Sequence, residues 1–170
     1  MTMNEPLNYL VFNTAMGWMG ILSSASGLRQ LVLSRRSAQE VRQLLGDSIK
    51  DAGQTPRPFQ DVMERLILYA SGHKVNFPDK LDLSGGTSFQ RAVWETTRLI
   101  PYGETRSYAW VAEQIEQPKA VRAVGQALGR NPLPIIIPCH RVLTSDGQLG
   151  GFTGGIKMKE KLLQLEGIDI

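Results

Sequence analysis

The chain contains one cysteine, Cys139, and the stretch around it, NPLPIIIPCHRV, carries the clearest chemical signal in the sequence. The β-branched run at 135–137 predicts a buried strand, and Pro138 should end it and begin a helical turn. Cys139 would then lie at a helix N-terminus, where backbone N–H groups and the helix dipole stabilise a thiolate, with His140 and Arg141 as further contributors. These features predict a nucleophilic thiol; the alternative is an inert buried cysteine, which is the commoner case for a lone cysteine.

His140, the next residue, is the candidate general base. Neighbouring side chains point about 100° apart on a helix, so we expect His140 to reach the thiol through a bridging water. A histidine base needs an acceptor that orients its ring, and the sequence holds no acid between Glu116 and Asp146. Glu166 is the candidate acceptor because Gly167 would fix it at a helix end; the alternative is an exposed surface glutamate. That helix should pack through Met158, Leu162 and Leu165.

Length and composition describe an ordinary globular protein. The 170 residues are 42% hydrophobic and 21% charged, which argues against disorder and against a disulfide-rich secreted scaffold. One cysteine cannot form an internal disulfide, and two histidines are too few for a structural zinc site. The sequence contains neither metal-ligand clusters nor glycine-rich phosphate loops, in agreement with a protein that needs no metal and no cofactor. No apolar run approaches the roughly 20 residues of a membrane span, and the first residues lack a signal-peptide pattern. We therefore expect a cytoplasmic protein.

The distribution of charge is more informative than the formal net charge of +3. The window from Gln117 to Ser145 holds four cations and no acid. Such a window is compatible with nucleic-acid binding, but four charges do not establish it, and the alternative is a solvated basic face. The four cations are Lys119, Arg122, Arg130 and Arg141.

The first half of the chain predicts a small α+β packing domain without chemistry. Alternating and β-branched segments indicate strands over 7–13, 19–24 and 28–34. Ser37 and Glu40 form a capping-box pattern ahead of a helix that Gly46 should end, and a second helix should begin at Pro58 and stop before Gly72. The proline- and glycine-containing stretch 72–87 marks a boundary, so we expect domains over 1–80 and 86–170.

The second half predicts helices. Ser88 should cap a helix that Pro101 ends, and two further helices are expected over 107–114 and 120–129 with a break at 116–119. Two short helices with a tight break suggest a helix-turn-helix. In the second of them, Val121, Val124 and Leu128 should face the core, and Arg122, Gly125, Gln126 and Gly129 should face outward.

The two glycines on that outward face need a physical reason, because each costs about 1 kcal/mol relative to alanine inside a helix. Close approach to a nucleic-acid backbone is one reason, with Arg122 projecting beyond the small side chains. The alternative is tight packing between helices with Arg122 solvated.

From about Ser88 to Gly167 the chain resembles the O6-alkylguanine-DNA alkyltransferases. The resemblance rests on NPLPIIIPCHRV, on GGFTGG and LLQLEG after it, and on GET-x-SYAWVA and KAVRAVGQAL before it, in the expected order. It implies an α+β fold, with a small N-terminal ribonuclease-H-like domain and a mainly helical C-terminal domain that carries a winged-helix-like helix-turn-helix. It also implies a DNA repair protein that flips the damaged base and irreversibly moves the alkyl group to Cys139, once per molecule. The substrate would be O6-methylguanine and, less well, O4-methylthymine.

The resemblance also assigns roles to individual residues. His140, held by Glu166, would take the thiol proton through a water, and Asn131 would brace the turn before the active-site loop. Tyr108 would donate to guanine N3 and crowd the 3′ phosphate, and Arg122 would be the finger that fills the space of the flipped base in the minor groove. Further DNA contacts are implied at Gln117, Ala123, Gly125 and Ser145, and pocket walls at Leu128, Val142, Phe152 and Thr153.

The implied partner is double-stranded DNA containing O6-alkylguanine, bound by a monomer away from any membrane. Phe152 stands where the family more often has tyrosine, so a hydroxyl contact is lost and the accepted alkyl size is open. One alternative is a non-catalytic protein that senses alkylguanine, but such alkyltransferase-like proteins carry another residue at the position of Cys139. A second alternative is a thiol hydrolase that uses Cys139 and His140. A hydrolase would turn over, an alkyltransferase would stop after one event, and a sensor would gain no mass.

Overall fold

The computed structural model describes residues 7–50, 52–152 and 154–170. Contacts between residues divide the chain into two compact units, Met1–Leu83 and Ser84–Ile170. The division falls inside the stretch 72–87, where the sequence places a boundary. The candidate chemistry lies in the second unit, and the first unit contains the larger sheet.

The first unit is built on a four-stranded sheet with the strand order β3-β2-β1-β4. The strands β1 (Asn8–Thr14), β2 (Gly17–Ser24) and β3 (Gly27–Arg35) form an antiparallel meander, and β4 (Gly53–Gln54) pairs in parallel with β1. The chain reverses after β1 and β2 at Gly17 and Gly27, whose φ angles of 107° and 139° favour glycine. The three strands that alternation predicted are confirmed.

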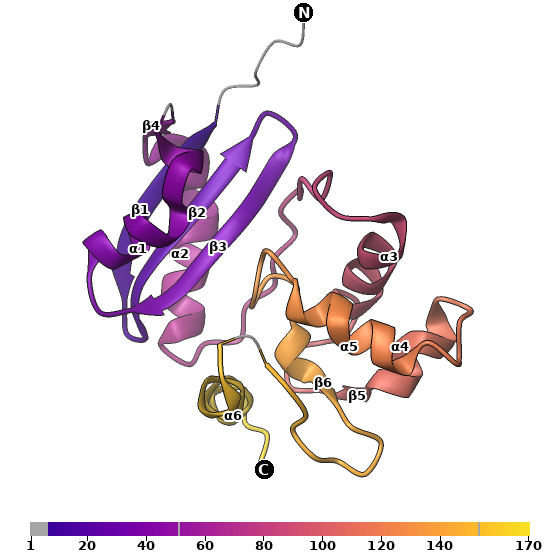
Figure 1. Ribbon diagram of the computed structural model, residues 1–170. Helices are drawn as coiled ribbons and strands as arrows, with labels where there is room; N and C mark the ends of the chain where they lie inside the picture. Colours follow the sequence, from indigo (N-terminus) through magenta and orange to yellow (C-terminus); the bar gives the residue numbers. More distant parts are fainter. Residues whose placement is uncertain (1–6, 51, 153) are drawn as a thin grey trace, which may run out of the picture. The chain divides into compact units, whose positions relative to one another are not determined.

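Two helices cover the two faces of this sheet (Figure 1). Helix α1 (Ala38–Leu45) begins after Ser37, whose side chain accepts a hydrogen bond from the Glu40 N–H at 3.1 Å, and a short helix η1 (Gly46–Ile49) follows it. Helix α2 (Gln60–Ala70) continues from η2 (Arg57–Phe59). Gly20 lets α1 approach closely, since a Cβ there would lie 2.3 Å from Val41 Cγ1. The core on the α1 side consists of Leu22, Val32, Val41 and Leu45.

The segment that follows α2 is fastened to the edge of the same unit. The backbone of Leu28 bonds to Lys80 and Asp82 at 2.9 and 2.7 Å, and Ser24 Oγ donates to the Asp82 carboxylate at 2.5 Å. Arg65 pairs with Asp79 at 2.6 Å on the same segment. These contacts extend the first unit to the end of the 72–83 stretch.

The second unit is mainly helical. It contains α3 (Ser88–Thr97), α4 (Tyr108–Gln114), α5 (Val121–Gly129) and α6 (Ile156–Leu165), together with the parallel two-residue strands β5 (Arg106–Ser107) and β6 (Val142–Leu143) (Figure 1). Helices α4 and α5 pack together, as the predicted helix-turn-helix requires. Trp94 on α3 donates to the Ala127 carbonyl at 2.8 Å and so fixes the end of α5. The α+β class is confirmed.

Three local predictions in the second unit are wrong: the N-cap of α3, the burial of Val121 and the strand at 135–137. Thr87, and not Ser88, caps α3, because Thr87 and Gln90 form a reciprocal capping box that places Ser88 inside the helix. Val121 is 38% exposed, since it begins α5 and lies beyond the packed face that Val124 and Leu128 form.

The predicted strand at 135–137 is instead a buried turn. Ile135 has a φ of 73°, and the Ile137 N–H donates to the Leu133 carbonyl at 2.8 Å. Burial accounts for the apolar run, because all three isoleucines are at most 3% exposed without forming a strand.

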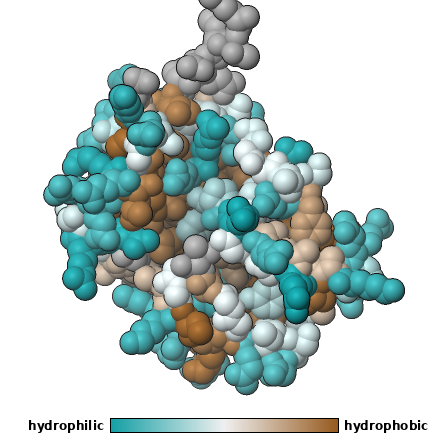
Figure 2. Space-filling model, viewed as in Figure 1, coloured by the Kyte–Doolittle hydropathy of each residue, from teal (hydrophilic) through white to brown (hydrophobic). Residues whose placement is uncertain are grey.

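On the face shown in Figure 2, hydrophobic side chains appear as patches between hydrophilic ones. Leu99, after α3, is the most exposed large hydrophobic side chain among the described residues, at 75%. Within the described ranges, no helix has the length and apolar character needed to cross a membrane.

Candidate active site

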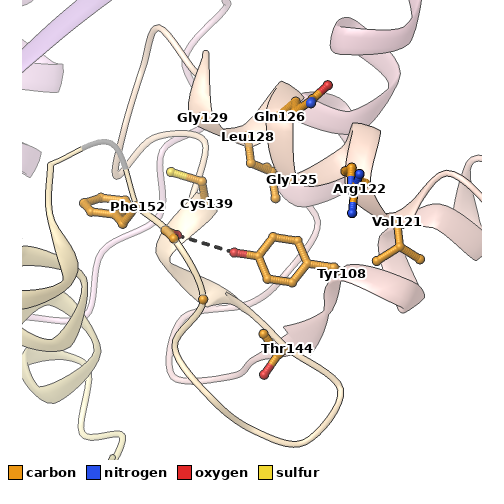
Figure 3. Close-up of a pocket in the computed structure, with 12 residues that line it drawn as sticks. Tyr108, Val121, Arg122, Gly125, Gln126, Leu128, Gly129, Cys139, Thr144 and Phe152 are labelled. Carbon is orange, nitrogen blue, oxygen red and sulfur yellow. Dashed lines mark hydrogen bonds between the residues drawn. The ribbon is translucent and has the colours of Figure 1, made fainter.

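A cavity of about 810 Å³ opens between α4, α5, the Cys139 turn and the loop after β6. Its walls come from segments that are far apart in the sequence, and Figure 3 shows Tyr108, Leu128, Cys139 and Phe152 arranged around it. Arg122 lies on the α5 side, away from Phe152. The cavity therefore gathers predicted nucleophile, DNA-binding and pocket residues: Tyr108, Arg122, Gly125, Leu128, Cys139 and Phe152.

Cys139 lies in the cavity wall and is 7% exposed. It begins η3 (Cys139–Arg141), a single three-residue turn whose dipole is small, and its own N–H is bonded to the Ile137 carbonyl at 2.7 Å. Burial raises the pKa of the Cys139 thiol, although a hydrogen bond from Asn131 and the charge of Lys159 act in the opposite direction. The predicted helical turn after Pro138 is confirmed, with Cys139 at its start, but burial acts against the thiolate that this position was expected to favour. A base is therefore needed to take the thiol proton.

Glu166 organises the groups behind this thiol. It is the C-cap of α6 and accepts hydrogen bonds from His140 Nε2, from Arg141 Nε at 2.8 Å and Nη2 at 3.2 Å, and from the Gly103 N–H at 3.0 Å. Burial alone would raise the pKa of Glu166, but the hydrogen bonds from His140 and Arg141, together with the charge of Arg141, lower it to about 2. The carboxylate is therefore ionised at neutral pH.

The ionised carboxylate determines the tautomer of His140. A carboxylate can only accept hydrogen bonds, so the ring nitrogen that faces it, Nε2, carries the proton. Burial is the main cause that lowers the pKa of His140, and the charges of Arg141 and Lys159 act in the same direction against the effect of Glu166. The ring is therefore neutral, and Nδ1 is its basic nitrogen. A proton can be accepted at Nδ1 while Glu166 holds Nε2.

Arg141 is part of this cluster and not part of a basic surface. Its Nη1 donates to the Ile100 carbonyl at 2.7 Å, and its guanidinium lies 5.7 Å from the centre of the Tyr102 ring. The interpretation of Arg141 as one of four surface cations is therefore wrong, because the charge is buried against Glu166. The other three cations of that window, Lys119, Arg122 and Arg130, are exposed.

Asn131 braces the turn before Cys139. Its side-chain amide donates to the Ile137 carbonyl at 2.8 Å, and its side-chain oxygen accepts from the Leu133 N–H at 2.8 Å. These bonds tie both ends of the buried 133–137 turn to one side chain. Since the Ile137 carbonyl also accepts from Cys139, Asn131 holds the backbone that presents the thiol.

Tyr108 begins α4, and its hydroxyl points toward the backbone of the loop at 150–151 (Figure 3). The hydroxyl donates to the Gly151 carbonyl at 3.4 Å, which is a long hydrogen bond. Gly150 has a φ of 69°, and a Cβ there would lie 2.8 Å from the Tyr108 oxygen. The position of Tyr108 therefore depends on a glycine at 150.

The remaining predicted residues are spread around the cavity and beyond it. Gln117 and Ser145 are exposed in the turns before α5 and after β6, and Ala123 is half-buried on α5. Val142 is buried, and its carbonyl accepts a hydrogen bond from Lys159 at 2.7 Å. Thr153 lies outside the described residues.

Sequence reasoning missed Lys159 on α6 altogether, and it named Arg141 beside the thiol but missed the bonds between Arg141 and Glu166. Lys159 precedes Glu166 by seven positions, and Leu162 and Leu163 between them are buried. Of the predicted stripe of Met158, Leu162 and Leu165, Leu162 is buried and the other two are half-buried. The spacing i, i+3, i+4, i+7 from position 159 was the available signal for a buried lysine. In the described part of the chain, no three His, Cys, Asp or Glu side chains are grouped as metal ligands.

Comparison with known proteins gives the family. A family model described as 6-O-methylguanine DNA methyltransferase, DNA binding domain, matches residues 88–168. The methylated-DNA–protein-cysteine methyltransferase of Mycolicibacterium paratuberculosis is 50% identical over 113 residues, which is 66% of this chain and 68% of that protein.

Solved structures agree over nearly the whole chain. Mycobacterium tuberculosis OGT in complex with DNA has a TM-score of 0.78 and 40% identity, over 94% of this chain and 92% of that one. The O6-methylguanine-DNA methyltransferase of the archaeon Pyrococcus kodakaraensis has a TM-score of 0.71 and 27% identity, over 94% and 99%. These findings confirm the resemblance seen in the sequence, and the chain belongs to the family of methylated-DNA–protein-cysteine methyltransferases.

Proposed function

We propose that this chain repairs DNA by moving the alkyl group from O6 of a guanine in double-stranded DNA to Sγ of its own Cys139. The observation that carries the proposal is the position of the Cys139 thiol in the wall of a cavity, next to a neutral His140 that Glu166 orients. A nucleophile, a base and an orienting carboxylate are the parts that activation of a thiol requires.

The reaction uses these parts in one displacement. His140 accepts the thiol proton at Nδ1 through a water, and the sulfur attacks the alkyl carbon. The S–C bond forms as the C–O6 bond breaks, and the electron pair of that bond remains on the purine, which becomes guanine after protonation. A thioether is a very poor leaving group, so each molecule reacts once.

Two residues adapt the cavity to a base taken out of a duplex. We propose that Tyr108 donates a hydrogen bond to N3 of the flipped purine and that Arg122 fills the space that the base leaves. The small residues Ala123 and Gly125 let α5 lie close to the DNA in the minor groove, with further contacts from Gln117 and Ser145. Leu128, Val142, Phe152 and Thr153 would surround the base, and O4-methylthymine would be a poorer substrate because it lacks the purine N3.

A sensor of alkylguanine without chemistry is not favoured. The curated relatives are methyltransferases, and Cys139 lies in the cavity wall with its base behind it. We propose that the protein acts as a monomer, because one unit of one chain supplies all of these groups. We further propose that it acts in the cytoplasm, where thiols stay reduced. The two units would serve as an N-terminal α+β domain and a C-terminal DNA-binding and alkyl-transfer domain.

The test is a mass measurement after incubation with a duplex that contains O6-methylguanine. We expect one methyl group per molecule, located on Cys139 by peptide analysis, with no second turnover. Cys139→Ser should bind the same duplex and gain no mass. Methyl on any other residue, or continued turnover, would contradict the proposal.

A matched arginine pair tests the finger. Arg122→Ala should slow transfer from duplex DNA and leave transfer from the free base O6-methylguanine unchanged, because only the duplex needs a residue that replaces the flipped base. Arg130→Ala, at a second exposed arginine beyond α5, is the control and should have little effect. Equal slowing of both substrates by Arg122→Ala would remove the finger role.

A further inference from the structure

Helix α6 presents two charged side chains on its buried face, Lys159 near its start and Glu166 at its end. Glu166 belongs to the cluster around His140, whereas Lys159 contacts the opposite part of the site, around Tyr108. Lys159 is fully buried, which is rare for a lysine unless its charge has partners. The mechanism above gives this ammonium group no task.

The three hydrogen-bond donors of the Lys159 ammonium have three oxygen acceptors. Nζ lies 2.7 Å from the Val142 carbonyl, 3.3 Å from the Tyr108 hydroxyl and 3.3 Å from the Gly151 carbonyl. Nζ also lies 5.5 Å from the centre of the Tyr108 ring. None of the three acceptors carries a charge, so the protein retains a buried cation here without an ion pair to these groups. A buried positive charge that is held only by neutral groups destabilises the folded protein, and a role in the reaction would explain why Lys159 is nevertheless buried here.

We propose that Lys159 is a positioning residue that makes Tyr108 a hydrogen-bond donor to the substrate purine. An ammonium group donates and cannot accept, so the Tyr108 oxygen must accept from Lys159 and keep its own hydrogen for another acceptor. In the free protein that acceptor is Gly151 at 3.4 Å, a bond long enough to be exchanged readily. This inference rests on the proposed function, because the new acceptor is N3 of the flipped guanine.

The charge of Lys159 strengthens this donor when it is needed. As the C–O6 bond breaks, negative charge grows on the purine, and a phenol polarised by an ammonium donates more strongly to it. Lys159 also holds the Val142 carbonyl at 2.7 Å, so one side chain joins the backbone next to Cys139–Arg141 to the Tyr108 hydroxyl of the cavity wall. Burial is the main cause that lowers the pKa of Lys159 to about 8, and the ammonium form still predominates at neutral pH.

The experiment removes the acceptor atom from the substrate. Methyl transfer is timed for wild-type protein and for Lys159→Met with two duplexes, one with O6-methylguanine and one with O6-methyl-3-deazaguanine, in which a C–H group replaces N3. We expect Lys159→Met to slow the parent substrate about tenfold to a hundredfold more than the deaza substrate, since a hydrogen bond to a charged partner is lost on one of them only. A ratio of the two rates that equals the wild-type ratio would overturn the inference.

The rate with the O6-methylguanine duplex divided by the rate with the 3-deaza duplex distinguishes this role of Lys159 from a folding defect and from a change in thiol reactivity. A folding defect or a change in thiol reactivity slows both substrates alike and leaves the ratio at its wild-type value. Tyr108→Phe should lower the ratio as Lys159→Met does, and the double variant should lower it no further. Lys159→Arg should keep the ratio closer to wild type, because a guanidinium also only donates. Additive losses in the double variant would overturn the inference.

A control and the wild-type reaction complete the test. Lys161→Met changes an exposed lysine of the same helix and should leave both rates unchanged. If wild-type protein gains no methyl on Cys139, the proposed function fails and this inference fails with it. If wild-type protein reacts but Lys159→Met keeps the wild-type ratio, only the role of Lys159 fails.

Discussion

The two units of the chain bury different kinds of side chains. In the first unit, the buried polar residues are short and close to the segment at 80–82, such as Ser24 and Asp82. In the second unit, the buried set includes His140, Arg141, Lys159 and Glu166. Buried charges are costly unless they are paired or hydrogen-bonded: Glu166 is paired with Arg141, and three neutral oxygens hold the Lys159 ammonium. Among the described residues, the buried basic side chains are therefore concentrated in the unit that contains the candidate thiol chemistry.

The largest expected difference between the units is the loss of stability when one arginine in each is replaced. Arg141→Met leaves the buried Glu166 carboxylate without its strongest donor and should destabilise the second unit by about 3–5 kcal/mol. Arg65→Met removes a partly exposed pair with Asp79 and should cost about 1 kcal/mol. Chemical denaturation, with hydrogen exchange to assign the loss to a unit, measures both.

The same two variants, Arg141→Met and Arg65→Met, also test which arginine affects the rate of methyl transfer. Arg141→Met should also slow methyl transfer under conditions where the variant is folded, because the Glu166 that orients His140 is no longer fixed. Arg65→Met should leave transfer unchanged. A destabilisation of equal size in the two units would show that burial of charge does not distinguish them.

This contrast also explains which features the sequence predicted. The strands of the first unit and the helix-turn-helix follow from local periodicity, and the start of α1 follows from Ser37 and Glu40, because each depends on neighbouring residues. Cys139 was predicted as the nucleophile from its place after Pro138 at the start of a helical turn and from the family resemblance, and its place in the cavity wall suits that role.

The missed features depend on partners that are distant in the sequence. Arg141 resembled a surface cation because the carboxylate that buries it lies 25 residues away. Lys159 contacts Tyr108 from 51 residues away, so no local pattern gives its task. The Ile135 turn was predicted as a strand because a short buried apolar run has the same composition in either conformation.

Glycine-to-alanine changes give the next largest contrast. In Gly20→Ala the new Cβ would lie 2.3 Å from Val41, so the first unit should lose about 1–3 kcal/mol of stability and transfer should stay unchanged. In Gly150→Ala the new Cβ would lie 2.8 Å from the Tyr108 oxygen, so transfer should slow about tenfold or more. Rates and unfolding curves are measured for both variants.

Gly147→Ala is the control for the second of these changes. Gly147 also has a positive φ, 83°, but no atom lies within 4 Å of a Cβ built there. It should therefore share the backbone cost of alanine in the left-handed region, about 1–2 kcal/mol, without affecting Tyr108. If Gly147→Ala slowed transfer as much as Gly150→Ala, backbone strain and not the displacement of Tyr108 would be the cause.

The pH dependence should also distinguish the second unit. The charge of Lys159 is present below its pKa of about 8 and is lost as the pH rises through that value. The groups that face it are Tyr108 and Cys139, whose pKa values are raised, and His140, whose pKa is lowered and which stays neutral at high pH. Above pH 8, the rate of transfer from the O6-methylguanine duplex should therefore fall by up to about tenfold relative to the rate from the 3-deaza duplex. A hydrogen bond that involves a charged group contributes about the free energy that corresponds to this factor.

The same pH series in Lys159→Met is the control. The fall relative to the 3-deaza duplex should disappear, because the titrating group is absent. An alkaline fall of unchanged size in this variant would assign the titration to another group.

The smallest expected effects come from the helix caps, where the two units should behave alike. Ser37→Ala removes the cap of α1 and Thr87→Ala removes one half of the capping box of α3, and each should cost about 1 kcal/mol. Hydrogen exchange of the first-turn amides measures the loss in each helix. Neither side chain takes part in the cluster around Cys139, so transfer rates should not change. If Thr87→Ala slowed transfer at unchanged stability, α3 would act on the site directly, and the contrast between the units would extend beyond their buried charges.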